Sequence, residues 1–350
     1  MFYTKAWRRI AGNANNGPRM FRIILFSLVT ILMLLSSVWA IMALWFQTPW
    51  GGLGRYVLPA LWVLCVVGLG YRLWFAEPWW HSLSGYVVML VLLIAWWNTI
   101  KPSHDRDWAD DVAFITTGTV QGDEVTLSHV RNFHWRSKDD YDIRWETREY
   151  DLSRLISVDM LTSSWGLPGI AHVLVSFGFE DGDYLVFTVE IRRKRHQSFS
   201  AVGGFFKEFE LAIVATDERD AVRVRTNIRE EDVSLYRIGL NAQDAKELFL
   251  SFVSQANYLA EHPRFYHTVT GNCTTIVYSM MKQIVDGLPL DYRLLLSGRL
   301  PSYVQAVNGM ASKRPLTELK QRGRISQLAR EAGDSKRFSS LIRQGVPGWE

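Results

Sequence analysis

The sequence contains two cysteines, and their settings differ. Cys65 lies inside an apolar run, whereas Cys273 follows the turn-forming segment 270–272 and precedes apolar residues at helical spacing. This pattern predicts that Cys273 occupies the first turn of a buried helix, with Asn272 and Thr274 supporting the helix start. At that position the helix dipole lowers the pKa of a thiol, and free N–H groups can hold an oxyanion. A small buried side chain with no chemistry would fit the same pattern.

A base for this thiol is expected on a β-hairpin. Segment 170–193 alternates between apolar and polar residues like two half-buried strands, with a turn at residues 180–183. Centring the turn on Asp181 places His172 opposite Glu190. A carboxylate in that position fixes the tautomer of the imidazole and stabilises the imidazolium. The pattern predicts a Cys–His–Glu set, although an ordinary surface pair or a register slipped by one residue would also fit the hairpin.

The remaining elements of this region must hold the hairpin and the cysteine helix together. Period-two runs predict further strands, and apolar residues in helical rhythm predict a helix at residues 242–261. We expect a mixed α+β domain in which the helix at Cys273 packs against the sheet that carries His172. The expected further strands lie at residues 111–120, 155–161, 209–217, 221–228 and 233–240.

Three apolar runs precede this domain. The first exceeds the roughly 20 residues that cross a bilayer and lacks an early cleavage pattern, so an anchor is favoured over a removable signal peptide. The third is short and must use its flanks. Tryptophans gather near the ends of the runs, where indole rings prefer the lipid–water interface. We expect three transmembrane helices within residues 21–100, at residues 21–46, 56–75 and 85–100.

Charge sets the expected orientation in a bacterial inner membrane. The arm at residues 1–20 is basic, and no acidic residue precedes Glu77, so the N-terminus is expected in the cytoplasm. Three crossings then place a linker at 101–111, a thiol domain at 112–310 and a tail at 311–350 in the periplasm. The tail suggests contact with anionic lipid rather than nucleic acid, although a solvated face would also fit. Its basic residues are Lys313, Arg314, Lys320, Arg322 and Arg324.

Three stretches resemble a known family. They are "RNFHWRSKDDYDIRWETREYDLSRL", "AHVLVSFGFEDGDYLVFTVEIRR" and "FYHTVTGNCTTIVYSMM". Their wording and order resemble the Lnb N-terminal periplasmic domain family, formerly a domain of unknown function, across residues 105–310. The order of histidine before cysteine is also similar, more distantly, to the circularly permuted NlpC-like branch of the papain superfamily. These resemblances imply a permuted papain-like fold with Cys273 as nucleophile, His172 as base and Glu190 as the orienting group.

The resemblance also implies acyl transfer through a thioester. Phospholipid would donate an acyl group to Cys273, and an amine, such as that of a lipoprotein, or water would collect it. A papain-like amidase or peptidase acting on cell-wall peptide and a non-catalytic binding domain remain alternatives. The sequence has no phosphate-binding glycine loop and no paired Cys-x-x-Cys motif, so neither a cofactor nor a metal is expected. The acyl donor, the acceptor and the oligomeric state stay open.

Overall fold

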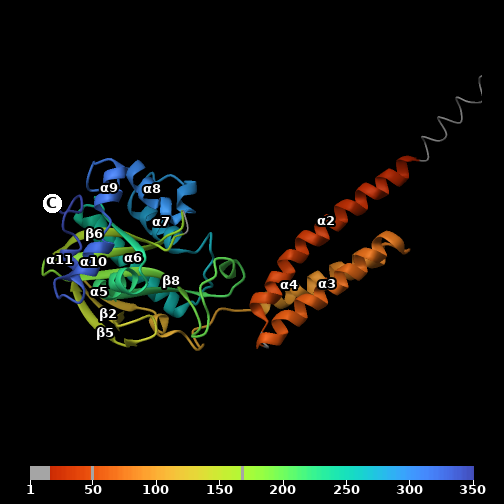
Figure 1. Ribbon diagram of the computed structural model, residues 1–350, viewed down its shortest axis with the longest axis horizontal. Coiled ribbons are helices and arrows are strands. Elements are labelled where there is room, and N and C mark those ends of the chain that lie inside the picture. Colours follow the sequence, from red (N-terminus) through yellow and green to blue (C-terminus); the bar gives the residue numbers. More distant parts are fainter. Residues whose placement is uncertain (1–15, 49–50, 167–168) are drawn as a thin grey trace, which may run out of the picture. The chain divides into compact units, whose positions relative to one another are not determined.

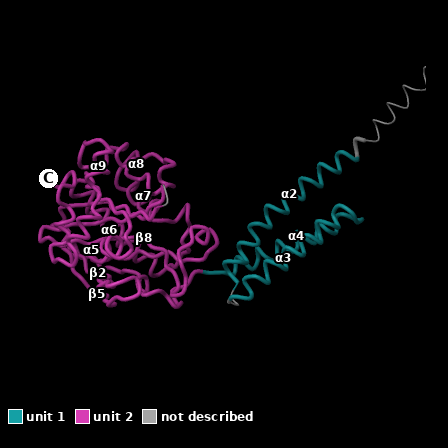
Figure 2. Tube along the Cα trace, viewed as in Figure 1, with its two compact units in different colours: residues 1–101 teal, residues 102–350 magenta. Residues whose placement is uncertain are grey.

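The computed structural model describes residues 16–48, 51–166 and 169–350. The chain forms two compact units, residues 1–101 and residues 102–350 (Figure 2). In the first unit, three helices are long and apolar enough to cross a membrane, as the sequence predicts. The last of them begins at Trp80, before the apolar run at residues 85–100. The residues that precede the run therefore lengthen the helix to a full span. These helices are α2 (Asn16–Gln47), α3 (Gly51–Phe75) and α4 (Trp80–Thr99).

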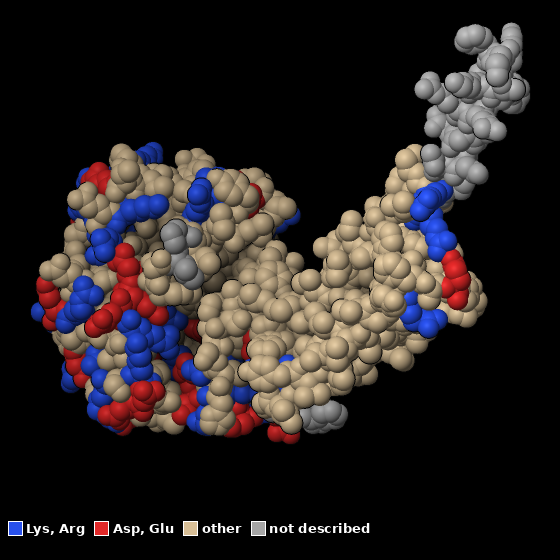
Figure 3. All heavy atoms as spheres, turned by 45° about the vertical axis from the view of Figure 1, so that its right-hand side comes forward, with Lys and Arg blue, Asp and Glu red and all other residues tan. Residues whose placement is uncertain are grey.

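The three helices pack through small and aromatic side chains and expose an apolar outer surface. Ala40 is fully buried, and the Tyr86 hydroxyl donates a hydrogen bond to the carbonyl of Met33 at 2.9 Å. Leu32 and Leu64 are among the many large apolar side chains that remain exposed. Few charged side chains interrupt the surface of this unit that Figure 3 shows, whereas the second unit carries many there. Such a surface suits contact with lipid tails.

The second unit is a mixed α+β domain built on one eight-stranded sheet (Figure 1). Its order is β1-β2-β9-β8-β7-β6-β10, and β5 also pairs with β2. Neighbours are antiparallel, except that β2 and β9 are parallel. The strands are β1 (Thr117–Gln121), β2 (Glu124–Arg131), β5 (Trp145–Asp151), β6 (Leu155–Ser164), β7 (His172–Phe179), β8 (Tyr184–Arg192), β9 (Glu210–Asp217) and β10 (Asp232–Arg237). A separate ribbon pairs β3 (His134–Trp135) with β4 (Tyr141–Asp142).

Helices cover both faces of the sheet, because the central strands carry buried apolar residues on both faces. On one face, Val173, Val175 and Phe177 belong to a core with helices α6 (Ala242–Glu261), α7 (Cys273–Ile284) and α8 (Leu300–Ala306). On the other, Leu174 and Val186 belong to a core with α5 (Glu218–Arg223), α10 (Ser326–Ala332) and α11 (Phe338–Leu341). The sheet therefore separates two sets of helices.

The hairpin of β7 and β8 has the predicted register. Leu174 pairs with Thr188 and Val175 with Phe187, which is the register expected from a turn centred on Asp181. Just beyond the last of these pairs, the side chains of His172 and Glu190 are 3.2 Å apart. The prediction of a strand at residues 221–228 is wrong. These residues lie in α5 and in a π-helix at Val224–Ile228. The Asp217 side chain caps α5 by accepting a hydrogen bond from the N–H of Arg219 at 3.0 Å. This local cap outweighs the short apolar alternation that suggested a strand.

The structure places both flanking segments inside the second unit, so its boundaries differ from those expected for a linker and a tail. Trp108 is buried and forms a β-bridge with Lys194. Residues 311–350 contribute α9 (Leu316–Arg322), α10 and α11, and Phe338 and Ile342 lie in the core. Basic side chains of this segment form ion pairs, as Arg314 does with Glu318 and Arg324 with Asp232. Charge alone did not reveal the apolar residues that fix the segment to the sheet.

Candidate functional site

Cys273 is the first residue of α7, as the sequence predicts. The side chain of Asn272 accepts hydrogen bonds from the N–H groups of Thr274 and Thr275, both at 2.9 Å. The Thr275 hydroxyl accepts one from the N–H of Asn272 at 3.1 Å, which completes a capping box. Asn272 therefore supports the helix start, but its cap occupies the N–H of Thr274. Among the described residues no acceptor pairs with the N–H of Cys273, so this N–H could donate to a bound oxygen atom.

His172, Thr188 and Glu190 form a hydrogen-bonded chain on one face of the hairpin. The Thr188 hydroxyl donates to Glu190 Oε1 at 3.0 Å and lies 2.6 Å from His172 Nε2. His172 Nε2 is also 3.2 Å from Glu190 Oε1. The Thr188 hydroxyl donates its proton to the carboxylate, so it can only accept a hydrogen bond from Nε2. Nε2 therefore carries a proton. Nδ1 is then the nitrogen that remains for the thiol of Cys273.

Arg225 completes the chain and was missed by sequence reasoning. Its Nη2 atom lies 3.1 Å from Glu190 Oε1, and its Nη1 donates to the carbonyl of Ala221 at 2.8 Å. It lies in the π-helix at Val224–Ile228, a kind of irregularity that is frequent at functional sites. Thr188 was missed too, although its spacing of two from Glu190 on the same strand gave a signal. Arg225 gave none, because its segment resembled a strand.

The electrostatics favour an ionised thiol. Burial raises the pKa of Cys273, but the hydrogen bond and charge of His172, with the N–H of Val173, outweigh burial and lower it. Burial lowers the pKa of His172, but the Glu190 carboxylate and the thiol raise it to about 9. Burial opposes the ionisation of Glu190, yet His172 and Arg225 hold its pKa well below the usual range. Each shift favours the charged form of its group: the thiolate of Cys273, the imidazolium of His172 and the carboxylate of Glu190.

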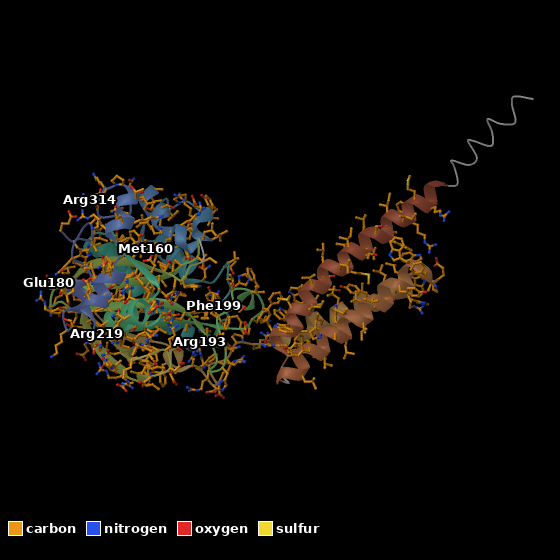
Figure 4. The ribbon with its side chains drawn as sticks, in the orientation of Figure 1. Met160, Glu180, Arg193, Phe199, Arg219 and Arg314 are labelled. Carbon is orange, nitrogen blue, oxygen red and sulfur yellow. The ribbon has the colours of Figure 1, made fainter. Side chains whose placement is uncertain are left out.

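The thiol opens into a cavity of about 360 Å³, which we call the polar pocket. Charged side chains of both signs line it, among them Asp111, Glu190, Arg193, Arg225, Arg229 and Glu231. Four large apolar lining residues are exposed to solvent: Trp165, Ile170, Phe199 and Leu295. Figure 4 labels Phe199 and Arg193, which represent these two kinds of lining. The pocket can therefore receive a substrate that is polar near the thiol and apolar at its edge.

No metal site emerges beside the thiol. Over residues 16–48, 51–166 and 169–350, no group of three or more His, Cys, Asp or Glu side chains is placed to hold a metal ion. His104, in the charged segment at the start of the second unit, instead contacts the carbonyl of Leu259 at 2.9 Å and Arg192 at 2.8 Å. Its setting is structural.

Comparison with known proteins supports the family resemblance. Residues 141–298 match the family model described as the Lnb N-terminal periplasmic domain. The matched range is shorter than expected, but it contains His172, Thr188, Glu190, Arg225 and Cys273. No curated protein and no solved structure matches the chain. The family match and the three apolar helices together indicate a membrane-anchored protein with a periplasmic domain.

Proposed function

We propose that this chain is a thiol acyltransferase that takes an acyl group from phospholipid onto Cys273. The observation that carries the proposal is the buried cysteine at the start of α7, hydrogen-bonded to His172 within the chain that Thr188 and Glu190 complete. Histidine on the hairpin before cysteine on a helix is the order of a permuted papain-like site. With the basic N-terminal arm in the cytoplasm, the domain would work at the periplasmic face of the inner membrane.

In the first half-reaction, His172 holds the proton of the thiol and the Cys273 thiolate attacks the ester carbonyl of a phospholipid. The N–H of Cys273 donates to the developing oxyanion. When the carbon–oxygen bond breaks, the imidazolium of His172 gives its proton to the departing oxygen, which becomes the free hydroxyl of the lysophospholipid. The product is an acyl thioester on Cys273 and a neutral His172.

In the second half-reaction, an amine attacks the thioester and His172 accepts the proton that the nitrogen loses. The carbon–sulfur bond breaks, an amide forms, and the thiolate returns beside the imidazolium. A lipoprotein amine fits this role, and water in its place would release a fatty acid. Glu190 stabilises the imidazolium in both halves, and Arg225 holds Glu190 in position.

Two features favour a lipid substrate. Residues 100 and 101 alone connect α4 to the second unit, and two extended residues span only about 7 Å. If α4 crosses the membrane, the domain stays close to the headgroups. The exposed Trp165, Phe199 and Leu295 at the polar pocket also suit contact with a lipid surface.

A papain-like amidase acting on cell-wall peptide is the second candidate. The same Cys–His–Glu chemistry cleaves amides, and the charged residues that line the polar pocket would suit a peptide. The short connection to α4 argues against it, because a cell-wall crosslink lies further from the membrane.

The test is to look for the acyl-enzyme. The full-length chain in phospholipid nanodiscs is quenched in acid at short times, and its intact mass and Cys273 peptide are measured. We expect an acyl adduct on Cys273 that persists in Cys65→Ala and is absent from Cys273→Ala. Cleavage of a cell-wall peptide without any adduct from phospholipid would contradict the proposal and favour the amidase.

A further inference from the structure

A second cavity, of about 260 Å³, lies against α7 and α8 on the opposite face of the sheet from α5. We call it the apolar pocket. Its floor includes Val158 and Met160 of β6 and Val173 and Val175 of β7, all buried. Met160 is labelled in Figure 4.

The lining of this pocket suits a hydrocarbon. Of the described residues that line it, Asp244 alone carries a charge, and Asp244 accepts a hydrogen bond from the Asn241 side chain at 2.9 Å. The hydroxyls of Tyr278 and Tyr303 donate to backbone carbonyls at 3.1 and 2.9 Å, so they are already satisfied. Aliphatic side chains make up most of the remainder. A polar ligand would find few partners here.

The apolar pocket and the polar pocket lie next to each other beside Cys273. Thr274 lines both cavities, and Val173, which lines the apolar one, bonds the thiol through its N–H. From this junction the apolar pocket follows one face of α7. Val277 and Met281 line it about 6 and 12 Å along the helix from Cys273, at a rise of 1.5 Å per residue.

We propose that the apolar pocket binds the acyl chain of the substrate while the headgroup occupies the polar pocket. The inference rests on the proposed function and adds the site that selects the length of the acyl chain. A dry cavity of about 150 Å³ holds a six-carbon ring. By that scale the pocket encloses a chain of roughly ten carbons. Each buried methylene strengthens binding by about fourfold.

The first test measures which chains reach Cys273. Nanodiscs of ether-linked phospholipid, which cannot donate an acyl group, carry a minor ester lipid with octanoyl, dodecanoyl or octadecanoyl chains. We expect Met281→Trp to lower the octadecanoyl adduct at least tenfold relative to the octanoyl adduct. Val277→Trp, closer to the thiol, should suppress both the dodecanoyl and the octadecanoyl adducts. Gln283→Trp, on the exposed side of α7, is the matched control and should keep the wild-type profile.

The second test needs no catalysis. Cys273→Ala protein in the same ether-lipid nanodiscs receives a fatty acid with a diazirine near its methyl end, and crosslinked peptides are mapped after irradiation. We expect crosslinks in β6, α7 and α8 that disappear when Val277→Trp is added.

The outcomes separate the two proposals. An adduct whose chain-length profile is the same in all four proteins would overturn the acyl pocket and leave the transferase intact. Crosslinks in the pocket with no adduct from any lipid would overturn the transferase and leave a lipid-binding cavity. Crosslinks that are confined to α2, α3 and α4, or that survive Val277→Trp, would overturn the pocket.

Discussion

Two buried charge networks lie on the same face of the sheet, and they differ in whether they lie beside a cavity and a thiol. One joins His172 and Glu190 to Arg225, and its members line the polar pocket beside a thiol. In the other, Arg343 binds Asp159 at 2.8 Å and Glu218 at 2.6 Å, and the three are 3% exposed or less. Burial and ion pairing are therefore common to both networks. The polar pocket and the adjacent thiol of Cys273 distinguish the candidate site from the second network, whose contacts are structural.

The pKa directions follow the same division. Burial raises the pKa of Asp159 even though Arg343 opposes it, whereas His172 and Arg225 overcome burial and lower the pKa of Glu190. In the Asp159 network, the ion pair of Arg343 with Asp159 holds residues 311–350 on β6. The Glu190 network sets the protonation of His172, which is a property useful to catalysis.

The largest expected effect is on activity when the first network loses its base or nucleophile. We predict that His172→Ala and Cys273→Ser each reduce acyl transfer by about 10⁴-fold, because removing one member of a catalytic set removes most of its effect. Both proteins should fold, which thermal unfolding would check. Full activity in either variant would mean that the network of His172 and Glu190 has no catalytic role.

The next effect is on stability, when the second network loses its cation. Arg343→Ala leaves the carboxylates of Asp159 and Glu218 buried without their cation, although each keeps one neutral hydrogen-bond donor. We predict a loss of about 3–5 kcal/mol in the free energy of unfolding of the domain. Denaturant titration measures it. The control is Arg324→Ala, whose pair with Asp232 is exposed and should contribute little. Equal stability of the two variants would mean that residues 311–350 do not depend on this network.

A smaller effect is expected for Glu190→Gln, with a signature in pH. We predict that acyl transfer falls by about 10- to 100-fold, less than for His172→Ala, because the amide still orients the ring but does not stabilise the imidazolium. In the wild-type protein the imidazolium that protonates the leaving group is lost as pH rises through about 9. Removing the carboxylate lowers the pKa of His172, so the alkaline limb of the pH–rate profile should move to lower pH. An unmoved limb would assign the raised pKa to another group.

The smallest effect is expected for Thr188→Val. The hydroxyl bridges His172 and Glu190, but the direct contact of 3.2 Å remains without it. We predict that acyl transfer falls by less than about tenfold, because the direct ion pair still orients the ring and only the bridging hydroxyl is lost. A loss as large as that of His172→Ala would make the bridge, rather than the direct ion pair, the means by which Glu190 acts.

Local patterns in the sequence were sufficient to predict the helix start at Cys273, the hairpin and the three apolar helices. Each depends on neighbours in the chain: Asn272 caps its own helix, and the turn at Asp181 fixes the register of His172 against Glu190. The resemblance to the Lnb N-terminal periplasmic domain family is supported by the match to residues 141–298. The permuted papain-like order of the site stays a prediction.

The missed features depend on contacts between distant segments. Arg225 reaches Glu190 because α5 and its π-helix pack on the sheet, and nothing near Arg225 in sequence indicates that partner. Arg343 lies far along the chain from Asp159, so residues 311–350 resembled a basic tail. The apolar pocket is formed by several elements at once. Periodicity identifies buried faces but not the space left between them.

The most direct test of the central claim is the pH dependence of Cys273 alkylation in the full-length Cys65→Ala protein. The rate of reaction with iodoacetamide is followed by peptide mass from pH 5 to pH 10, with and without His172→Ala. An ordinary cysteine titrates near pH 8.5. We predict an inflection below that value, which moves upward when the imidazolium is removed, because His172 lowers the pKa of the thiol. An inflection at or above the ordinary value, or one that ignores His172→Ala, would contradict an activated nucleophile at Cys273.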